Sequence, residues 1–388
     1  MDISSLRLER VGQIELADIT FGDLTVLVGP QATGKSIFLQ FLKLVADTGY
    51  VHDQLRKHGI DWNRKVPDFL DVYLGDGMQE IWRSGDAPSA VTVNGNPGDM
   101  PALARPARRT TRASVFYIPA QRVLSLANGW PRPFSGFGSE DPFAVRDFSE
   151  TFRILMEQEL GRADALFPKT NRLKKEYREL LSQHVFGGFG LQVDRHGAQK
   201  RLVLRHSATS KAIPYMAWSA GQREFVPLLM GLYWLMPSAR VKRRENLNWV
   251  VIEELEMGLH PSAISVVLLL VMGLLWRGYR VCLSTHSPHV LDVVWALRTI
   301  QGHHAEPDCL LDVFDVRKTE PMKAVAADVL SKQARVYYFD PDGRTRDISK
   351  LDPGSEDALE AGWGGLSEFS GRVADVVAAV VNGSSRAE

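Results

Sequence analysis

The chain contains the stretch Gly29-Pro30-Gln31-Ala32-Thr33-Gly34-Lys35-Ser36. It matches the pattern G-x-x-x-x-G-K-[ST] at every constrained position. An apolar strand is expected before it, over Leu24 to Val28, and an apolar helix after it, from Ile37. In that context the backbone N–H groups and the helix N-terminus bind phosphate oxygens, Lys35 reaches the β- and γ-phosphates, and Ser36 offers its hydroxyl to Mg²⁺. Residues Gly29 to Ile37 are therefore predicted to bind the phosphates of a nucleotide.

Composition narrows the class of protein. The 388 residues include 46 Lys and Arg against 46 Asp and Glu, so there is no global basic field and any DNA contact has to be local. The apolar run 264–276 is too short to span a bilayer, which predicts no membrane partner. Cys282 and Cys309 lie in or beside apolar runs and are expected to be reduced core thiols of a cytoplasmic protein.

Two further apolar strands end in polar side chains. Trp249 to Ile252 ends in Glu253-Glu254, and Arg280 to Ser284 ends in Thr285-His286-Ser287-Pro288. Continuous apolar strands alternating with helices predict an α/β fold with a mostly parallel core sheet. The carboxyl ends of such strands form one edge, where sites lie. Before them, Ser219-Ala220-Gly221-Gln222-Arg223 opens another helix.

The pattern divides the chain into six predicted segments. They are the first section of the α/β core with the phosphate loop (1–49), a β-rich arm (50–113), a returning strand followed by Gln121 (114–127), a helical lobe with a small β-hairpin (128–212), the second section of the core (213–300) and a small α/β C-terminal tail (301–388).

The five motifs, in this order over residues 1–300, resemble the ABC-type ATPases of the AAA family, in the RecF/SMC-like and OLD-like branch. Ile252 to Pro261, IEELEMGLHP, is similar to that branch's Walker B and D-loop, and Leu283 to Pro288 is similar to its switch-histidine loop. The resemblance implies an ABC-type P-loop ATPase head with an N-terminal antiparallel β-meander, a β-rich arm and a helical lobe insertion.

The resemblance also implies a role for each motif, with ATP and Mg²⁺ as cofactors. Glu254 is expected to orient the attacking water, and His286 to contact the γ-phosphate. Ser36, Glu253 and Gln121 are expected around Mg²⁺, with Gln121 also contacting the nucleotide.

The signature turn carries an expectation about assembly. In the family resembled, Ser219, Gly221 and Gln222 complete the ATP site of a second subunit, which implies a head-to-tail dimer or higher oligomer. Three positions depart from the family's usual residues: Glu253 replaces Asp, Leu255 replaces Pro, and Ala220 stands where transporter signatures have Gly. These departures put the rate of hydrolysis in doubt more than the binding of ATP.

Two features of related ATPases, a long coiled-coil insertion and a fused nuclease domain, bear on what this ATPase is for. No long heptad insertion is present, and the D-x-D of Asp340-Pro341-Asp342 is favoured as a hairpin turn over a fragment of a nuclease motif. The tail is expected to dock a partner or another copy of the chain.

The function that these features favour is an ATPase that gates a separate effector, such as a nuclease or toxin. It resembles ATPase subunits of bacterial anti-phage systems of the PARIS and Septu types. One alternative is a RecF-like DNA-binding repair ATPase with basic clusters at 105–112, 169–175 and 240–244 as its footprint; another is a nucleotide-sensing scaffold that hydrolyses slowly.

Overall fold

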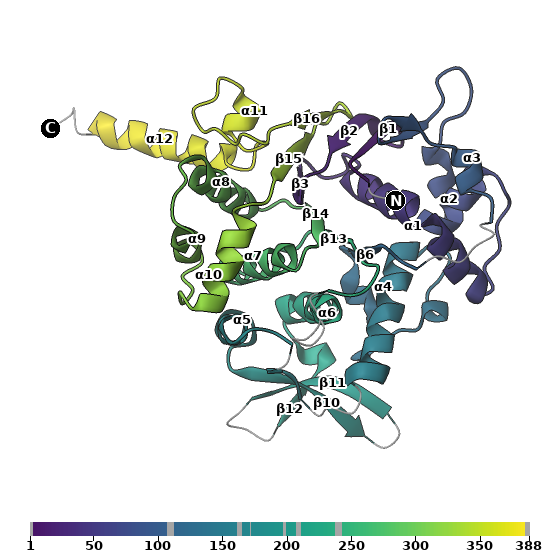
Figure 1. The fold of residues 1–388 in the computed structure, drawn as a ribbon, viewed down its shortest axis with the longest axis horizontal. Coiled ribbons are helices and arrows are strands. Elements are labelled where there is room, and N and C mark those ends of the chain that lie inside the picture. The colour runs from purple at the N-terminus through teal and green to yellow at the C-terminus, as the bar shows by residue number, and fades with distance from the viewer. Residues whose placement is uncertain are drawn as a thin grey trace.

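The fold is organised around a six-stranded sheet with the order β16-β15-β3-β14-β13-β6 (Figure 1). The computed structural model describes residues 3–106, 112–160, 165–170, 172–196, 199–206, 211–236 and 243–384. Five strands run parallel and β16 is antiparallel to β15. The strands are β3 (Leu24–Val28), β6 (Val115–Ile118), β13 (Trp249–Ile252), β14 (Arg280–Ser284), β15 (Ala334–Phe339) and β16 (Thr345–Asp347).

The sheet separates two apolar cores. In β13, Val250 and Ile252 belong to the core that contains helices α6 (Ala220–Leu235) and α7 (Pro261–Trp276). Trp249 and Val251 belong to the other core, with α1 (Lys35–Lys57). Strands buried on both faces read as continuous apolar runs, so the prediction of a mostly parallel α/β core is confirmed.

The C-terminal region of the chain enters this sheet, which corrects its description as a small tail. Strand β15 pairs in parallel with β3, with Ala334 opposite Leu24 and Tyr338 opposite Val28. The residues before it form α8 (Pro288–Gly302), α9 (Asp308–Val313) and α10 (Glu320–Val329). Sequence patterns reveal a strand but not a partner about 310 residues away, which is why the pairing was missed.

The expected N-terminal meander is present. Strands β1 (Ser5–Val11) and β2 (Ile14–Thr20) are antiparallel, and β4 (Ala90–Val93) joins β1 with the short β5 (Asn96–Pro97) beyond it. They form a second, four-stranded sheet next to α1 (Figure 1).

The predicted β-rich arm over 50–113 contains more helix than strand, which corrects that expectation. Helix α1 continues to Lys57, and α2 (Val66–Leu74) and α3 (Met100–Leu103) follow. In α2 the buried side chains include Phe69, Leu70, Tyr73 and Leu74, a helical spacing that was interpreted as alternation. Residues 107–111 of the expected basic linker lie outside the described residues.

A lobe below the sheet in Figure 1 combines helices and a small antiparallel sheet, as predicted for 128–212. Its hairpin pairs β10 with β11. The elements are β7 (Leu126–Ala127), β8 (Trp130–Pro131), α4 (Phe143–Ile154), which continues as a π-helix to Leu160, β9 (Ala165–Phe167), α5 (Lys175–Leu181), β10 (Phe189–His196), β11 (Gln199–His206) and β12 (Ala212–Pro214).

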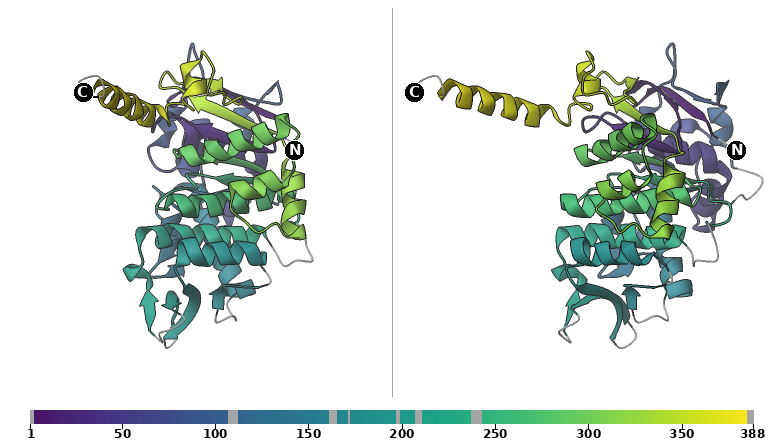
Figure 2. Two further views of the ribbon diagram at one scale, coloured as in Figure 1. Left: turned by 90° about the vertical axis from the view of Figure 1, so that its left-hand side faces the viewer. Right: turned by 60° about the vertical axis from the view of Figure 1, so that its left-hand side comes forward.

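Two long helices of the second half of the chain differ in burial. Helix α7 is buried along most of its length, whereas α12 (Glu368–Ser384), after the short α11 (Ala358–Ala361), extends away from the body (Figure 2). Among the described residues, no helix is both long and apolar enough to cross a membrane. Cys282 is buried as expected, but Cys309 is exposed on α9, so the prediction of two core thiols was wrong for Cys309.

Candidate functional site

The loop between β3 and α1 encloses its own lysine. The Lys35 ammonium nitrogen donates to the carbonyl oxygens of Gly29 at 2.8 Å and Pro30 at 2.6 Å. It also lies 3.4 Å from the Thr33 hydroxyl oxygen. The charge is therefore held in the centre of the loop, where it can turn to an anion that enters the loop.

Gly34 allows the loop to close onto the N-terminal sheet. Its φ of +94° lies in the left-handed region, and a Cβ placed on it would come within 2.5 Å of Cγ1 of Ile14. A side chain at this position is excluded both by the backbone conformation and by the contact. Helix α1 starts directly from the loop at Lys35, and its first residues, Lys35 to Ile37, line the cavity described next.

A cavity of about 200 Å³ lies at this loop. Most of its lining comes from the predicted residues, and Glu254 and His286 reach it from the ends of β13 and β14. The lining residues are Gln13, Gln31, Ala32, Thr33, Gly34, Lys35, Ser36, Ile37, Glu254, Ser284 and His286. The structure thus brings together residues from four separate stretches of sequence. Gln13 and Ser284 were not predicted to line the site. Gln13 belongs to no motif, and Ser284 is only a neighbour of His286 in the histidine-loop motif.

Glu253 is the most buried acid at this edge of the sheet. Its exposed fraction is 2%, and its Oε2 accepts the Ala120 N–H at 3.0 Å. Its Oε1 is buried and has no hydrogen-bond partner. Burial raises the pKa of Glu253, while the Ala120 N–H and the neighbouring hydroxyls of Ser36 and Tyr117 oppose that rise.

These features fit a Mg²⁺ ion. A buried carboxylate oxygen without a partner, beside a serine hydroxyl, is a hard oxygen donor set of the kind that Mg²⁺ prefers. Ser36 and Glu253 are the residues that would hold it. Among the described residues no group of three or more His, Cys, Asp or Glu could hold a metal ion by itself.

Glu254 occupies a strained position at the end of β13. Its φ is +43°, in the left-handed region that non-glycine residues rarely adopt. Its N–H donates to the Ser284 carbonyl oxygen at 3.0 Å, and its Oε1 lies 3.8 Å from Nε2 of His286. The two side chains are about a third exposed, so both can meet a ligand in the cavity.

The histidine loop is fixed by an acid that the sequence reasoning did not single out. Oε1 of Glu256 accepts the His286 backbone N–H at 2.5 Å. Burial raises the pKa of Glu256, and the N–H of His286 acts against that rise. Glu256 was visible only as a member of a motif, and its partner is 30 residues away in sequence.

Arg122 is a second residue that the sequence reasoning missed. Its fully buried guanidinium donates to the carbonyl oxygens of Glu253 at 3.0 Å and Glu254 at 3.1 Å. It also donates to the Glu224 carbonyl oxygen in α6 at 3.2 Å, and its Nε lies 3.5 Å from the Glu224 carboxylate. One cation therefore joins the end of β13 to α6. Its neighbour Gln121 is exposed and does not line the cavity, so its expected contact with nucleotide or Mg²⁺ stays a prediction.

The signature turn lies apart from the cavity. Ser219 caps α6, since its hydroxyl accepts the Gln222 N–H at 3.2 Å while the Gln222 side chain accepts the Ser219 N–H at 3.1 Å. This reciprocal capping box satisfies two donors of the helix end. A Cβ at Gly221 would come within 2.5 Å of the Gly258 carbonyl oxygen. The turn therefore packs on the loop after β13, and none of its residues lines the cavity.

Electrostatics at the cavity follow from burial. Desolvation lowers the pKa of Lys35 to about 8, although Glu254 and Glu256 act in the opposite direction. Burial and the charge of Lys35 lower the pKa of His286. At neutral pH the cavity therefore contains one ammonium and a neutral imidazole.

The D-x-D stretch forms a turn, as predicted. Asp340 and Gly343 lie between the antiparallel strands β15 and β16, and the Asp340 N–H donates to the Arg344 carbonyl oxygen at 2.8 Å. The Asp340 carboxylate is engaged by Arg346 at 2.7 Å.

Comparison with known proteins gives one family match. Residues 122–292 match a family model described as "AAA domain, putative AbiEii toxin, Type IV TA system". The search of curated proteins found no match. Together with the loop geometry, the family match supports an ATP-binding ABC-type P-loop ATPase.

Solved structures with a similar fold are SMC heads. An SMC head bound to the C-winged helix domain of ScpA is 9% identical, with 89% of this chain and 97% of that chain covered and a TM-score of 0.40. The SMC head domain from Thermotoga maritima is 14% identical (75% and 92% covered, TM-score 0.31). A head domain with an extended coiled coil, bound to the C-terminal domain of ScpA derived from Pyrococcus furiosus, is 8% identical (89% and 95% covered, TM-score 0.35). TM-scores this low support no inference about function.

Proposed function

We propose that this protein hydrolyses ATP in a site shared between two copies arranged head to tail, and that the assembly gates a separate effector. The observation that carries the proposal is the division of the site. The cavity at the phosphate loop contains Lys35, Glu254 and His286, while Ser219 and Gly221 lie outside it on the same chain.

Within the cavity the residues divide the work of phosphoryl transfer. The backbone N–H groups at the start of α1 and the Lys35 ammonium bind the phosphates. Glu254 orients and polarises the attacking water, and His286, neutral at pH 7, hydrogen-bonds the γ-phosphate. Arg122 acts through these residues, because it holds the backbone on which Glu254 stands.

Ser36 and Glu253 are the residues that would hold Mg²⁺, with Gln121 as a further candidate. When bound, the ion neutralises charge on the phosphates. The longer Glu at position 253, in place of the Asp usual in the family resembled, is compatible with slow turnover.

The signature turn supplies the second half of the site in this proposal. The capped N-terminus of α6 carries partial positive charge and an exposed serine hydroxyl, which suit a phosphate presented by another molecule. Each copy has one phosphate loop and one such turn, so two copies arranged head to tail form two sites.

The effector and the defence role rest on analogy. A separate nuclease or toxin as the partner, and anti-phage defence as the setting, follow from the resemblance to ATPase subunits of anti-phage systems. The matched family's description names a putative toxin of a type IV toxin–antitoxin system and no partner. Helix α12 exposes Phe369, Val376 and Val380 by 60% or more, which supports association with another chain.

A DNA clamp gains no support from the described basic residues. Arg172 and Arg244, from two of the three expected clusters, both pair with Glu159, at 2.7 Å and 2.5 Å. Lys174 lies over the Trp276 ring at 4.5 Å. Residues 107–111, 171 and 240–242 of those clusters lie outside the described residues.

The testing experiment is molecular mass in solution with Mg²⁺-ATP, for the wild type and Glu254→Gln. We expect nucleotide-dependent association that the substitution prolongs, because ATP binds and is not cleaved. Glu320→Gln, which changes a 90% exposed carboxylate in α10, is the matched control and should behave as wild type. If wild type and Glu254→Gln both stay monomeric with saturating ATP, the shared site is wrong.

A further inference from the structure

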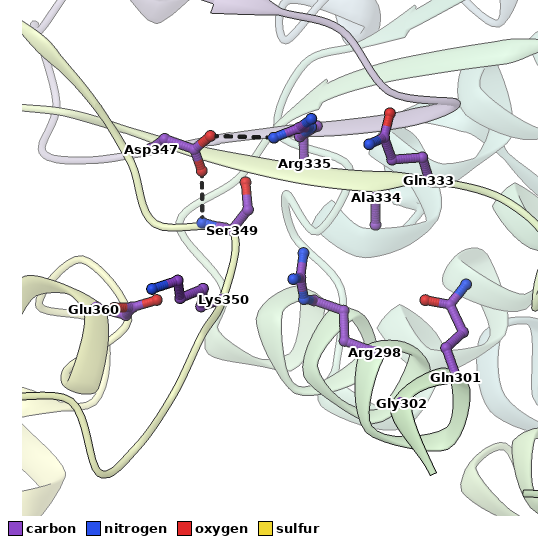
Figure 3. Close-up of a pocket in the computed structure, with 10 residues that line it drawn as sticks. All are labelled: Arg298, Gln301, Gly302, Gln333, Ala334, Arg335, Asp347, Ser349, Lys350 and Glu360. Atoms are coloured by element: carbon purple, nitrogen blue, oxygen red, sulfur yellow. Dashed lines mark hydrogen bonds and ion pairs between the residues drawn. The ribbon is translucent and has the colours of Figure 1, made fainter. Parts of the chain in front are cut away.

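A larger cavity, of about 680 Å³, lies elsewhere on the molecule. Figure 3 shows it between α8, the start of β15 and the chain that follows β16. It shares no lining residue with the phosphate-loop cavity. Its size falls in the range of small-molecule sites, roughly 300–1,000 Å³. We propose that it binds a phosphorylated ligand of nucleotide size.

The first argument is an excess of cations. Arg298, Arg335 and Lys350 line the cavity, against the two carboxylates of Asp347 and Glu360. In the portion of the chain that the structure describes, the side chains of Arg298 and Lys350 form no hydrogen bond or ion pair. In Figure 3 the Arg298 guanidinium points from α8 into the open space, toward the chain that carries Lys350.

Both carboxylates already have partners. Asp347 lies 3.5 Å from Nη1 of Arg335 and accepts the Ser349 N–H at 2.8 Å. Glu360 accepts the Ser355 hydroxyl at 3.0 Å. The three cations exceed the two carboxylates by one, so the lining keeps one net positive charge, and Arg298 faces the open space. Both cationic residue types bind phosphate, arginine through a planar fork and lysine as a point charge.

A buried donor points to the same ligand class. Nε of Arg335 is buried and has no hydrogen-bond partner. Leaving a buried donor without a partner is costly, so such groups call for an explanation. The end of α8 in the cavity lining is fixed by hydrogen bonds, because the Gln301 side-chain amide donates to the carbonyl oxygens of Leu330 and Lys332, both at 2.9 Å.

An aromatic surface adjoins the cations. A neighbouring hollow of about 330 Å³ shares Arg298, Gly302 and Lys350 with the cavity and is bounded by Trp295. The Trp295 side chain is 40% exposed, and its ring centroid lies 6.0 Å from that of Trp363. An indole face beside two cations suits a base that stacks while its phosphates meet the charges. The aromatic surface therefore favours a nucleotide over inorganic phosphate as the ligand.

The cavity also has a direct connection to the ATP site. Helix α8 begins at Pro288, two residues after His286, and ends at Gly302 in the cavity wall. Strand β15, whose first residues line the cavity, pairs with the strand that leads into the phosphate loop. A ligand in the cavity thus contacts one helix that begins beside His286 and one strand that pairs with β3.

The test uses the full chain carrying Lys35→Ala, which disables the phosphate loop. Inorganic pyrophosphate, AMP, GMP, CMP and UMP are the probes in isothermal titration calorimetry. We expect at least one nucleotide to bind with one site per chain. Arg298→Ala and Lys350→Ala should each weaken it about tenfold, as for loss of a charge-assisted hydrogen bond. Arg317→Ala, an exposed arginine paired with Glu179 and outside the lining, is the matched control and should leave binding unchanged.

Trp295→Ala distinguishes a nucleotide ligand from an inorganic phosphate ligand. We expect it to weaken the nucleotide about tenfold, the scale of one stacked base, and to leave pyrophosphate unchanged. No effect of Trp295→Ala on any nucleotide overturns the nucleoside component of the proposal. Absence of binding for every probe, or binding unaffected by Arg298→Ala together with Lys350→Ala, overturns the site.

A second measurement tests the cavity in the wild-type chain, without the Lys35→Ala substitution. The wild-type chain, saturated with a non-hydrolysable ATP analogue, is titrated with the same probes, and thermal melts check that each variant folds. A second binding event that Arg298→Ala removes supports the cavity. Failure of ATP hydrolysis or of dimerisation in the earlier experiment leaves these results unaffected, so the two proposals fail separately.

Discussion

The phosphate-loop cavity and the signature turn are held in opposite ways. Around the cavity, Glu253 and Arg122 are buried and bound to groups from distant stretches of the chain. At the turn, Ser219 and Gln222 bond to each other across three residues, and Ser219 is exposed. The first region is organised inside one chain, whereas the second is prepared by local sequence and faces outward. This difference is what a site completed by a second copy requires.

Loss of the buried Arg122 guanidinium should have the largest effect, a loss of folding stability. Arg122→Met leaves carbonyl oxygens and the Glu224 carboxylate without their donor, which is expected to destabilise the fold by about 3–5 kcal/mol. Chemical denaturation measures it. Arg317→Met, at an exposed arginine, is the control and should cost under about 0.5 kcal/mol. A similar small cost for Arg122→Met would show that the cavity is no more firmly held than the turn.

Loss of the loop lysine should be next. Lys35→Ala removes the only ammonium among the residues lining the phosphate-loop cavity and is expected to weaken Mg²⁺-ATP binding by about a hundredfold or more, roughly 2.7 kcal/mol. Titration calorimetry at neutral pH measures the affinity. Unchanged affinity would mean that ATP does not bind at this loop.

A change at the signature turn should separate binding from turnover. Ser219→Arg places a bulky cation on the exposed helix N-terminus, which should lower ATP turnover about tenfold or more, roughly 1.4 kcal/mol, and abolish association. ATP binding to the isolated chain should stay as in wild type. If binding falls together with turnover, the turn belongs to its own chain's site and the comparison fails.

The smallest effect concerns pH. Burial and Lys35 lower the pKa of His286 below its usual value of 6.5, so the unfolded chain takes up a proton at this residue before the folded one does. The folded state therefore loses stability as pH falls through about 6.5. His286→Asn should lose less stability than wild type between pH 7.5 and pH 5.5, by under about 1 kcal/mol because the side chain is 28% exposed. Thermal melts at the two pH values measure the difference. Equal losses of stability in wild type and His286→Asn would show that His286 does not contribute to this pH dependence.

Local patterns predicted the features of the site that depend on neighbours in sequence. The strand before Gly29, the strand before Glu253 and the helix after Ser219 all follow from continuous apolar runs and turn residues. The region over α2 was misjudged because short apolar spacings fit both a strand and a helix.

The roles of Arg122 and Glu256 were beyond such reasoning. Arg122 bonds to backbone carbonyl oxygens 131 and 132 residues away, and Glu256 to a backbone N–H 30 residues away. Every residue carries a backbone carbonyl and nearly every one an N–H, so no sequence pattern marks the partners. The same holds for Gln13, which reaches the cavity from the turn between β1 and β2.

By itself, the sequence determined the phosphate loop, the parallel core and the order of the motifs, because backbone conformation and burial of these segments depend on residues close together in the chain. Only the tertiary structure decided that β15 lies beside β3, that Arg122 joins β13 to α6, and that Arg298 and Lys350 line the same second cavity. Those contacts join residues tens to hundreds of positions apart, and their geometry is set by how the whole chain packs.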